Sequence, residues 1–303
     1  GITDILYAVG ISPDKLDRVV ALHRQGCRLT VLLDCAAQAK AVAAASKTSG
    51  ITIPAMIEID SDGHRSGLTA DDPALIEVGR ILHEGGAELS GVLCHAGESY
   101  GAVGRTQQAI CAEEERLAVV NSAAMLRKSG LPCPVVSVGS TPTAHAAQDL
   151  TDVTELRAGV YVFFDLVMAG IDVCDIGDIA LSVLTTVIGH QAAKGWTICD
   201  AGWMAMSRDR GTANQRVDQG YGIVCDVAGT VIPGLIMIQA NQEHGVIAVR
   251  EGSGGVLPDL PVGTRLRVLP NHACATAAQH QSYRVVPEMP DAELMTWARF
   301  GGW

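Results

Sequence analysis

The sequence predicts an α/β protein in two parts, a (β/α) barrel-type domain over residues 1–177 and a β-domain over residues 178–303. Over the first part, apolar β-branched runs alternate with helical patterns, which is typical of parallel strands joined by crossover helices. After about residue 177, short strands separated by Gly and Pro turns replace this rhythm. Polar residues also follow several strands of the first part, as they do in barrel enzymes.

The first part contains a regular series of strands and helices. Strands are expected near residues 3–9, 29–34, 53–60, 88–95, 134–138 and 153–157. Helices are expected near residues 13–25, 36–48, 72–84, 106–129 and 142–149. The helix at 72–84 follows Asp71-Asp72-Pro73, and a proline in the first turn is a signal for a helix N-terminus.

The number of βα units leaves two architectures open. About six units are visible, whereas a closed barrel needs eight, so the rhythm alone slightly favours an open doubly wound sheet. A dinucleotide-binding sheet would carry G-x-G-x-x-G after its first strand, and residues 9–13 do not. Polar or Gly-rich segments instead follow several different strands, at residues 60–67, 95–100, 139–143 and 157–161. Barrel enzymes build their sites in this way, so the strand ends favour a barrel.

The second part has the pattern of a separate β-domain. Short strands are expected near residues 180–190, 196–200, 221–226, 235–240 and 264–269. No internal repeat or low-complexity tract interrupts either part.

Composition excludes several classes of partner. The formal charge of −11, with Lys and Arg thinly spread, disfavours nucleic acid and favours a small-molecule partner. No apolar stretch reaches the roughly 18 residues needed to span a bilayer, and the first residues do not have the pattern of a secretory signal. The nine cysteines are odd in number and never form a C-x-x-C pair, which predicts reduced thiols in the cytoplasm.

Two strand ends offer a candidate phosphate site. Ser140 and Thr141 follow a strand and precede a helix, where backbone N–H groups and the helix dipole favour an anion. Both residues can equally be helix N-caps, and alone that interpretation is the better one. Gly159 and Val160 follow the next strand and could close on the same phosphate. Two adjacent strand ends of this kind therefore predict a cofactor phosphate site.

Further candidate residues lie at other strand ends and in the β-domain. Arg65 and His95 follow two different strands, although single residues of these types are more often structural or solvated. In the β-domain, His272 and Cys274 are two residues apart, and on an extended strand both side chains would point the same way. Imidazole and thiolate suit Zn²⁺ with open coordination positions. The alternative is a buried cysteine beside a hydrogen-bonded histidine.

The order of several short motifs identifies a family. The series HRSG, HAGESY, SVGSTPTA, RAGVYVFFD, DAGWMAMSRDRGT, NQEHG and LPNHACATAAQ resembles the D-serine dehydratase and D-threonine aldolase family over essentially the whole chain. The resemblance implies a barrel of the alanine racemase type that binds pyridoxal 5′-phosphate, followed by a β-domain. It is strongest to the branch that dehydrates D-threo-3-hydroxyaspartate to oxaloacetate and ammonia. D-serine dehydratase, D-threonine aldolase and a non-catalytic pyridoxal phosphate-binding protein are the alternatives.

The resemblance also assigns roles to residues. Arg65 would lie near the cofactor ring and its phenolic oxygen, with His95 and Arg157 as polar surroundings. The phosphate would be held by Ser140, Thr141, Gly159 and Val160, with Tyr100 and Tyr161 as further cofactor contacts. His272 and Cys274 match the divalent-metal pair (Zn, Mn, Mg or Co). The aldolase branch tends to have Asp at the second metal position, so Cys274 favours a dehydratase.

The resemblance raises one difficulty, because family members carry two further βα units before the strand near residues 3–9. The first of those units bears the Schiff-base lysine. The lysines of this chain are Lys15, Lys40, Lys47, Lys128 and Lys194, and none is expected at a strand end facing the barrel mouth. We therefore expect a barrel without its first two βα units, inactive by itself, with the complete enzyme a homodimer.

Overall fold

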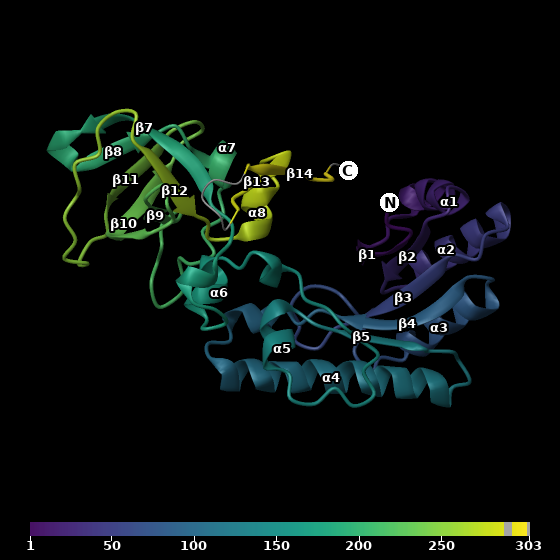
Figure 1. Cartoon of the computed structure of the whole chain (residues 1–303). Helices are drawn as coiled ribbons and strands as arrows, with labels where there is room; N and C mark the ends of the chain where they lie inside the picture. The colour runs from purple at the N-terminus through teal and green to yellow at the C-terminus, as the bar shows by residue number, and fades with distance from the viewer. Residues whose placement is uncertain (288–292, 302–303) are drawn as a thin grey trace. The chain divides into compact units, whose positions relative to one another are not determined.

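The chain forms two compact units in a computed structural model that describes residues 1–287 and 293–301. The units are Gly1–Gly159 and Val160–Trp303. Figure 1 shows a sheet flanked by helices in the first unit and a β-barrel in the second. The segment before the expected boundary at residues 177/178 belongs to the second unit because its backbone pairs there, with the N–H of Leu166 donating to the Pro270 carbonyl oxygen over 3.1 Å. The domain boundary expected at residues 177/178 therefore stays a prediction.

The first unit is built on a parallel sheet whose strands follow one another in chain order. The strands are β1 (Asp4–Gly10), β2 (Arg28–Leu33), β3 (Pro54–Ile59), β4 (Glu88–Cys94), β5 (Val135–Val138) and β6 (Glu155–Leu156). A doubly wound sheet reverses its strand order at a switch point, and this sheet does not. The strand order is therefore that of part of a (β/α) barrel, and the doubly wound alternative is wrong.

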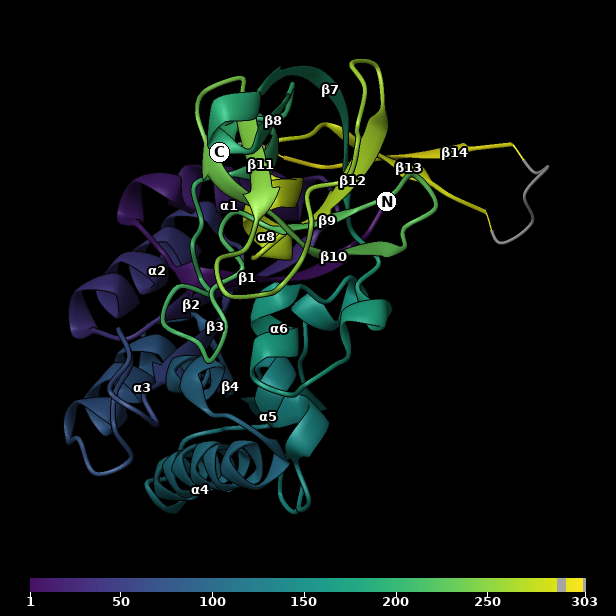
Figure 2. The same ribbon diagram turned by 90° about the vertical axis from the view of Figure 1, so that its left-hand side faces the viewer.

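Helices cover one face of this sheet. They are α1 (Leu16–Arg24), α2 (Ala36–Ser49), α3 (Ala74–Glu84), α4 (Arg105–Lys128) and α5 (Thr141–Ala146), with short 3-10 turns η1 (Pro13–Lys15) and η2 (Gly97–Gly101). Figure 2 shows α1 to α4 following one another along the outside of the sheet. The main core lies between the two layers and includes Val31, Ile57 and Val92, which are fully buried. Leu32, Met56 and Leu93 point to the opposite face in a smaller cluster, as strand alternation requires.

The second unit contains a closed antiparallel barrel with the strand order β10-β11-β8-β7-β12-β9. Its strands are β7 (Val183–Gln191), β8 (Trp196–Cys199), β9 (Ile223–Cys225), β10 (Val231–Ala240), β11 (Gly245–Val249) and β12 (Arg265–Leu269). The expected strands are confirmed, but β11 was not expected. It is a short run buried on both faces, so it lacks the alternation that marks a half-exposed strand.

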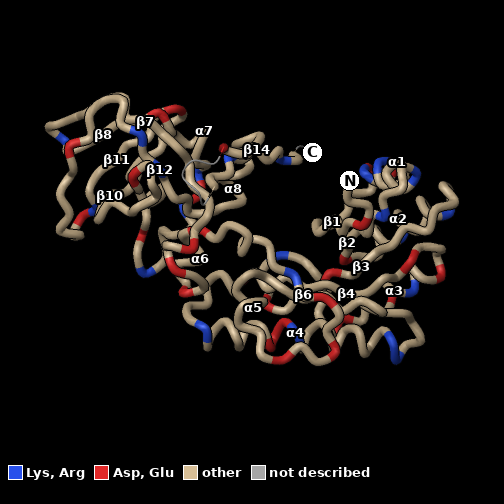
Figure 3. The backbone as a smooth tube through the Cα atoms, viewed as in Figure 1, with Lys and Arg blue, Asp and Glu red and all other residues tan. Residues whose placement is uncertain are grey.

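Short elements surround this barrel. They are η3 (Val160–Val162), α6 (Leu166–Gly170), η4 (Ile176–Asp178), η5 (Ala192–Lys194), α7 (Trp203–Met206), α8 (Ala273–Ala277), β13 (Ser282–Val285) and β14 (Met295–Ala298). Within the described part of the chain, no helix combines the length and apolarity needed to cross a bilayer. Figure 3 shows basic residues scattered among acidic ones along both units.

Candidate functional site

The carboxyl ends of the parallel strands bring together residues that lie far apart in the sequence. His95 follows β4, Ser140 follows β5 and Arg157 follows β6. The Nδ1 atom of His95 lies 3.4 Å from the Gly139 carbonyl oxygen, and the backbone N–H of Arg157 donates to the Val138 carbonyl oxygen over 2.8 Å. The two segments predicted to hold a phosphate are therefore neighbours at their strand ends.

The Arg157 guanidinium reaches across the strand ends toward β4. Its Nε donates to Ser137 Oγ over 2.8 Å, and its Nη2 donates to the Cys94 carbonyl oxygen. The side chain is only 24% exposed. Burial lowers the pKa of Arg157, and the nearby Glu115 carboxylate opposes this effect. Two fixed acceptors thus hold a partly desolvated positive charge at this edge of the sheet.

His95 is half-buried beside this arginine. Its ring centroid lies 6.0 Å from that of Tyr100. Burial lowers the pKa of His95, and the positive charges of Arg65 and Arg157 lower it further. The imidazole is therefore neutral near pH 7, so one ring nitrogen can donate a hydrogen bond while the other accepts.

Arg65 lies in the exposed loop that follows β3. The next residue, Ser66, donates from its Oγ to Oε2 of Glu58 over 3.2 Å. Burial raises the pKa of Glu58, and the Ser66 hydrogen bond and the Arg65 charge oppose the rise. The Arg65 charge thus affects the pKa of both Glu58 and His95.

Ser140 is the N-cap of α5, as the alternative interpretation expected. Its Oγ accepts from the backbone N–H of Thr143 over 3.3 Å, and its own N–H donates to Thr143 Oγ1 over 2.9 Å, which completes a capping box. Thr141 is the first residue of the helix and is 1% exposed. The phosphate contact of both residues stays a prediction.

The geometry expected for His272 and Cys274 is wrong. The strand β12 ends at Leu269, His272 is the N-cap of α8, and Cys274 is the second residue of that helix. Alternation along a strand therefore does not align the two side chains. They nevertheless lie close enough for the Cys274 side chain to raise the pKa of His272, because the cap residue is next to the first helical turn.

Asp209 completes this group from a distant part of the sequence. Its Oδ2 lies 2.7 Å from Nδ1 of His272. The Asp209 hydrogen bond, followed by the one to Cys274, raises the pKa of His272 to about 10. The same contact lowers the pKa of Asp209. The Asp209 carboxylate thus binds Nδ1 of His272, so Nε2 is the ring nitrogen that remains for another partner.

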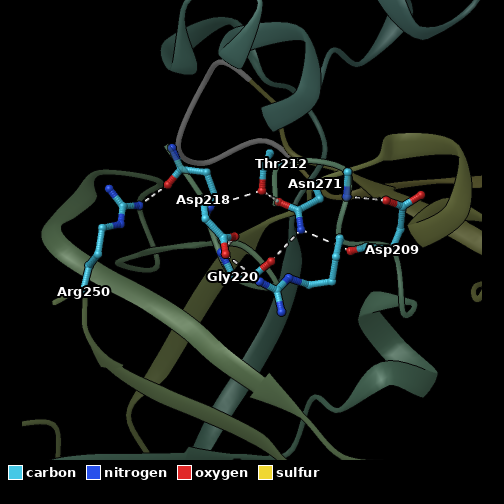
Figure 4. A network of polar contacts seen from close by, with 9 residues as sticks. Asp209, Thr212, Asp218, Gly220, Arg250 and Asn271 are labelled. Atoms are coloured by element: carbon cyan, nitrogen blue, oxygen red, sulfur yellow. Dashed lines mark hydrogen bonds and ion pairs between the residues drawn. The ribbon is translucent and has the colours of Figure 1, made fainter. Parts of the chain in front are cut away.

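The loop that carries His272 is held by the buried residue before it (Figure 4). Asn271 is 3% exposed. Its Oδ1 accepts from Thr212 Oγ1 over 3.0 Å, and its Nδ2 donates to the carbonyl oxygens of Asp209 over 3.1 Å and Gly220 over 2.7 Å. One amide therefore joins this loop to the segment that bears Asp209.

A second buried side chain fixes the other end of the loop. Oδ2 of Asp165 accepts from the Ala273 N–H over 2.9 Å, and its Oδ1 accepts from the Met168 N–H over 3.0 Å. Asp165 is 1% exposed, and burial raises its pKa while these two hydrogen bonds oppose the rise. The first N–H of α8 is thus satisfied by a carboxylate from outside that helix.

Comparison with known proteins identifies the family. The model "Alanine racemase, N-terminal domain" matches residues 1–167, and "Putative serine dehydratase domain" matches residues 180–286. D-threo-3-hydroxyaspartate dehydratase of Delftia sp. (strain HT23) is 56% identical over 306 residues, covering 100% of this chain and 80% of that protein. The chain therefore belongs to the family that contains D-threo-3-hydroxyaspartate dehydratase. D-serine dehydratase of Dictyostelium discoideum is 27% identical over 298 residues, covering 93% and 74%.

Solved structures of the family agree with the fold. The Delftia enzyme superposes with a TM-score of 0.96 at 56% identity, covering 100% of this chain and 80% of that one. Variants of D-threo-3-hydroxyaspartate dehydratase have also been solved, one with a cysteine replaced by alanine in the metal-free form and one with a histidine, two positions earlier, replaced by alanine. Alanine racemase of Clostridium difficile 630, at 15% identity and a TM-score of 0.57, shares the fold alone.

His272 and Cys274 are the two residues of the second unit that were expected to bind a metal ion. Among residues 1–287 and 293–301, no group of three or more His, Cys, Asp or Glu side chains is arranged to hold a metal ion. The metal role of His272 and Cys274 stays a prediction. Nitrogen and sulfur donors of this kind fit Zn²⁺.

The remaining expected cofactor contacts are Gly159, Val160 and Tyr161, which follow one another in the sequence. Gly159 ends the first unit, and a Cβ there would meet no atom within 4 Å. This open space is compatible with a ligand beside its backbone. Val160 and Tyr161 begin the second unit in η3, where Val160 is buried and Tyr161 is exposed. Their contact with a cofactor stays a prediction.

Sequence reasoning missed two carboxylates: Asp209 contacts His272, and Glu115 accepts from backbone N–H groups next to His95 and Ser140. Asp209 is 63 residues away from His272, and only its place in the motif DAGWMAMSRDRGT marked its segment. Glu115 lies in the run Glu113-Glu114-Glu115, which is typical of a solvated helix face. Its spacing from the buried residues Ala112 and Val119 on α4 was the available signal.

Proposed function

We propose that this chain is part of an enzyme that converts D-threo-3-hydroxyaspartate to oxaloacetate and ammonia with pyridoxal 5′-phosphate and a divalent metal. The observation that carries the proposal is the 56% identity to D-threo-3-hydroxyaspartate dehydratase over the whole of this chain. In the reaction the substrate loses the α-proton and the β-hydroxyl group as water, and a water molecule then hydrolyses the C–N bond. The net products are one 2-oxo acid and one ammonia.

The edge of the parallel sheet would hold the cofactor. Pyridoxal phosphate, when bound, supplies an electron sink for the charge left at Cα after proton removal. Arg157 offers a positive charge that its own hydrogen bonds keep in place, and neutral His95 offers a donor or an acceptor without adding charge. Arg65 would approach from the loop after β3. Ser140, Thr141 and the open backbone at Gly159 would receive the phosphate.

The loop before α8 would hold the metal. A divalent metal, when bound, supplies Lewis acidity toward a hydroxyl oxygen. Asp209 engages Nδ1 of His272, which directs Nε2 toward a ligand position, a common arrangement for metal-binding histidines. The solved histidine and cysteine variants of the relative, one of them in the metal-free form, support the same pair of residue types in this chain.

The Schiff-base lysine is, in this proposal, none of the lysines in this chain. Lys15 donates to the Tyr7 hydroxyl over 3.0 Å, and Tyr7 packs against the core on the helix-covered face of the sheet. The Lys194 ammonium lies 4.4 Å from the centroid of the Trp196 ring. The other three, Lys40, Lys47 and Lys128, are exposed on helices. A lysine from elsewhere in the complete protein would therefore complete the site.

An activity measurement tests the function. Release of 2-oxo acid and ammonia should be followed for D-threo-3-hydroxyaspartate, D-serine and D-threonine, with pyridoxal phosphate and Zn²⁺ or Mn²⁺ present. We expect turnover of D-threo-3-hydroxyaspartate only from a chain that also carries two βα units with a strand-end lysine before Gly1. Preference for D-serine would shift the proposal to that dehydratase, and glycine release from D-threonine would shift it to an aldolase. Turnover by the 303-residue chain alone would contradict the lysine proposal.

The metal pair has its own test. His272→Ala and Cys274→Ala should each lower bound Zn²⁺ and dehydration together. Cys35→Ala is a matched control, because Cys35 is also an exposed free cysteine. A Cys274→Ala protein that keeps its metal and full activity would show that the pair is structural.

We also propose a cytoplasmic homodimer, which is supported by free cysteines throughout the described residues and by the family resemblance.

A further inference from the structure

We propose that Glu115 is a positioning residue that sets the spacing between the loop carrying His95 and the loop carrying Ser140. The inference rests on the proposed function, because those loops are the ones assigned to pyridoxal phosphate. Glu115 itself would touch neither cofactor nor substrate. It would act by holding the backbone of both loops from the helix layer beneath them.

The contacts of Glu115 join three separate pieces of the first unit. Its Oε1 accepts from the backbone N–H of Ala96 over 3.1 Å and from that of Gly139 over 2.9 Å. Its Oε2 accepts from the Thr143 hydroxyl over 2.8 Å. These donors belong to the loop after β4, the loop after β5 and the first turn of α5. One side chain from α4 therefore ties together the strand ends on which His95 and Ser140 stand.

A carboxylate is the side chain that these donors require. The two backbone N–H groups converge on Oε1 and the Thr143 hydroxyl donates to Oε2, so both terminal atoms must accept, which a carboxylate does and an amide does not. Glu115 is 1% exposed, so an apolar replacement would leave three buried donors without a partner. Burial raises the pKa of Glu115, while the hydrogen bonds from Gly139 and Thr143 and the nearby Arg157 charge favour its ionised form.

The same carboxylate sets the direction of the hydroxyl hydrogen bonds around Ser140. Thr143 donates its only hydroxyl proton to Glu115, so its oxygen accepts from the Ser140 N–H over 2.9 Å. Ser99 donates to the Ala96 carbonyl oxygen over 2.6 Å. Ser140 Oγ, 2.8 Å from Ser99 Oγ, therefore donates to Ser99. Removing the charge of Glu115 releases the Thr143 proton and loosens this whole arrangement.

The test compares Glu115→Gln with Glu113→Gln, a matched exposed position on the same helix that pairs with Arg116. Pyridoxal 5′-phosphate is the probe, and its dissociation constant is measured by equilibrium dialysis, which needs no Schiff base. Because hydrogen bonds to a charged group are among the stronger ones, we expect Glu115→Gln to weaken binding about tenfold or more. Glu113→Gln should bind like the wild-type protein.

A milder variant keeps the test decisive if Glu115→Gln does not fold. Thr143→Val removes one donor and the capping hydroxyl, so it should weaken binding by a smaller factor. Equal affinity of the wild-type protein and the folded variants would overturn the positioning role. A loss of stability without a loss of affinity would also overturn it, because that is the signature of a structural side chain. If the wild-type chain and its lysine-bearing extension both fail to bind the probe, the proposed function and this inference fall together.

Discussion

The two units hold their candidate residues by different means. In the first unit, His95, Ser140 and Arg157 stand directly at the ends of parallel strands, and the backbone ladder of the sheet already makes them neighbours. In the second unit, His272 stands in a loop that has left β12, and side chains hold it: Asn271 within the loop and Asp165 from a distant segment. Strand topology brings the first group together and Glu115 braces its loops, whereas the second group depends on buried polar side chains alone.

The comparison shows which positions of each unit should be sensitive to substitution. Where a sheet arranges the site, the critical atoms are backbone atoms at close strand ends. Where polar side chains arrange it, the critical atoms are their oxygens, since a buried donor left without a partner is costly. Tryptophan fluorescence separates the two responses, because the first unit, residues 1–159, contains no tryptophan, whereas Trp196, Trp203 and Trp297 lie in the second unit.

The largest effect should come from Gly139→Ala in the first unit. Gly139 has a φ of +132°, and an added Cβ would lie 2.0 Å from the Arg157 carbonyl oxygen. The β5 and β6 ends would have to separate, so we expect a loss of more than about 3 kcal/mol, or failure of the unit to fold. Urea unfolding followed by far-UV circular dichroism, which is dominated by the helices of this unit, measures the loss.

Gly159→Ala is the matched control for that substitution. Its Cβ would meet no atom within 4 Å, and its φ lies outside the left-handed region. Stability should therefore stay within about 1 kcal/mol of the wild-type protein. Equal effects of the two substitutions would show that the close approach of the strand ends is not what holds the first site.

The second largest effect should come from Asp165→Ala in the second unit. The substitution leaves the Ala273 and Met168 N–H groups buried without their acceptor, so we expect a loss of about 2–4 kcal/mol. Tryptophan fluorescence during urea unfolding measures it. Asp259→Ala, at an exposed position of the same unit, should change nothing measurable. An Asp165→Ala protein as stable as this control would mean that the loop before α8 does not need its buried carboxylate.

The smallest effect should be a pH dependence due to Glu58. Its pKa is raised by burial, so its contribution to stability is complete below about 4.5 and is lost as the pH rises through the higher folded value. Glu58→Gln cannot titrate. The wild-type protein should therefore lose stability relative to this variant between pH 4.5 and neutral pH, in the circular dichroism signal. A constant difference in stability across that pH range would show that burial does not raise the pKa of Glu58.

Two carboxylates illustrate how far the sequence could predict the candidate sites. Arg65, His95, Ser140 and Arg157 were predicted because each lies in a segment that follows a strand, and parallel strand ends meet at one edge. Glu115 was missed because it reaches that edge from the middle of a helix, within a run of glutamates that resembles a solvated surface. Asp209 was missed because nothing local relates it to His272, 63 residues away.

By itself the sequence determined the alternation of strands and helices in the first unit, the change to short strands in the second, and the residues at the strand ends. These features follow from local periodicity and turn residues, which need no knowledge of distant contacts. Only the tertiary structure decided that the strands follow chain order, that His272 and Cys274 meet at a helix N-terminus rather than along a strand, and that Glu115 and Asp209 serve the two groups. The physical reason is that hydrogen bonds between buried groups depend on which segments pack together, and that packing brings together residues remote in sequence.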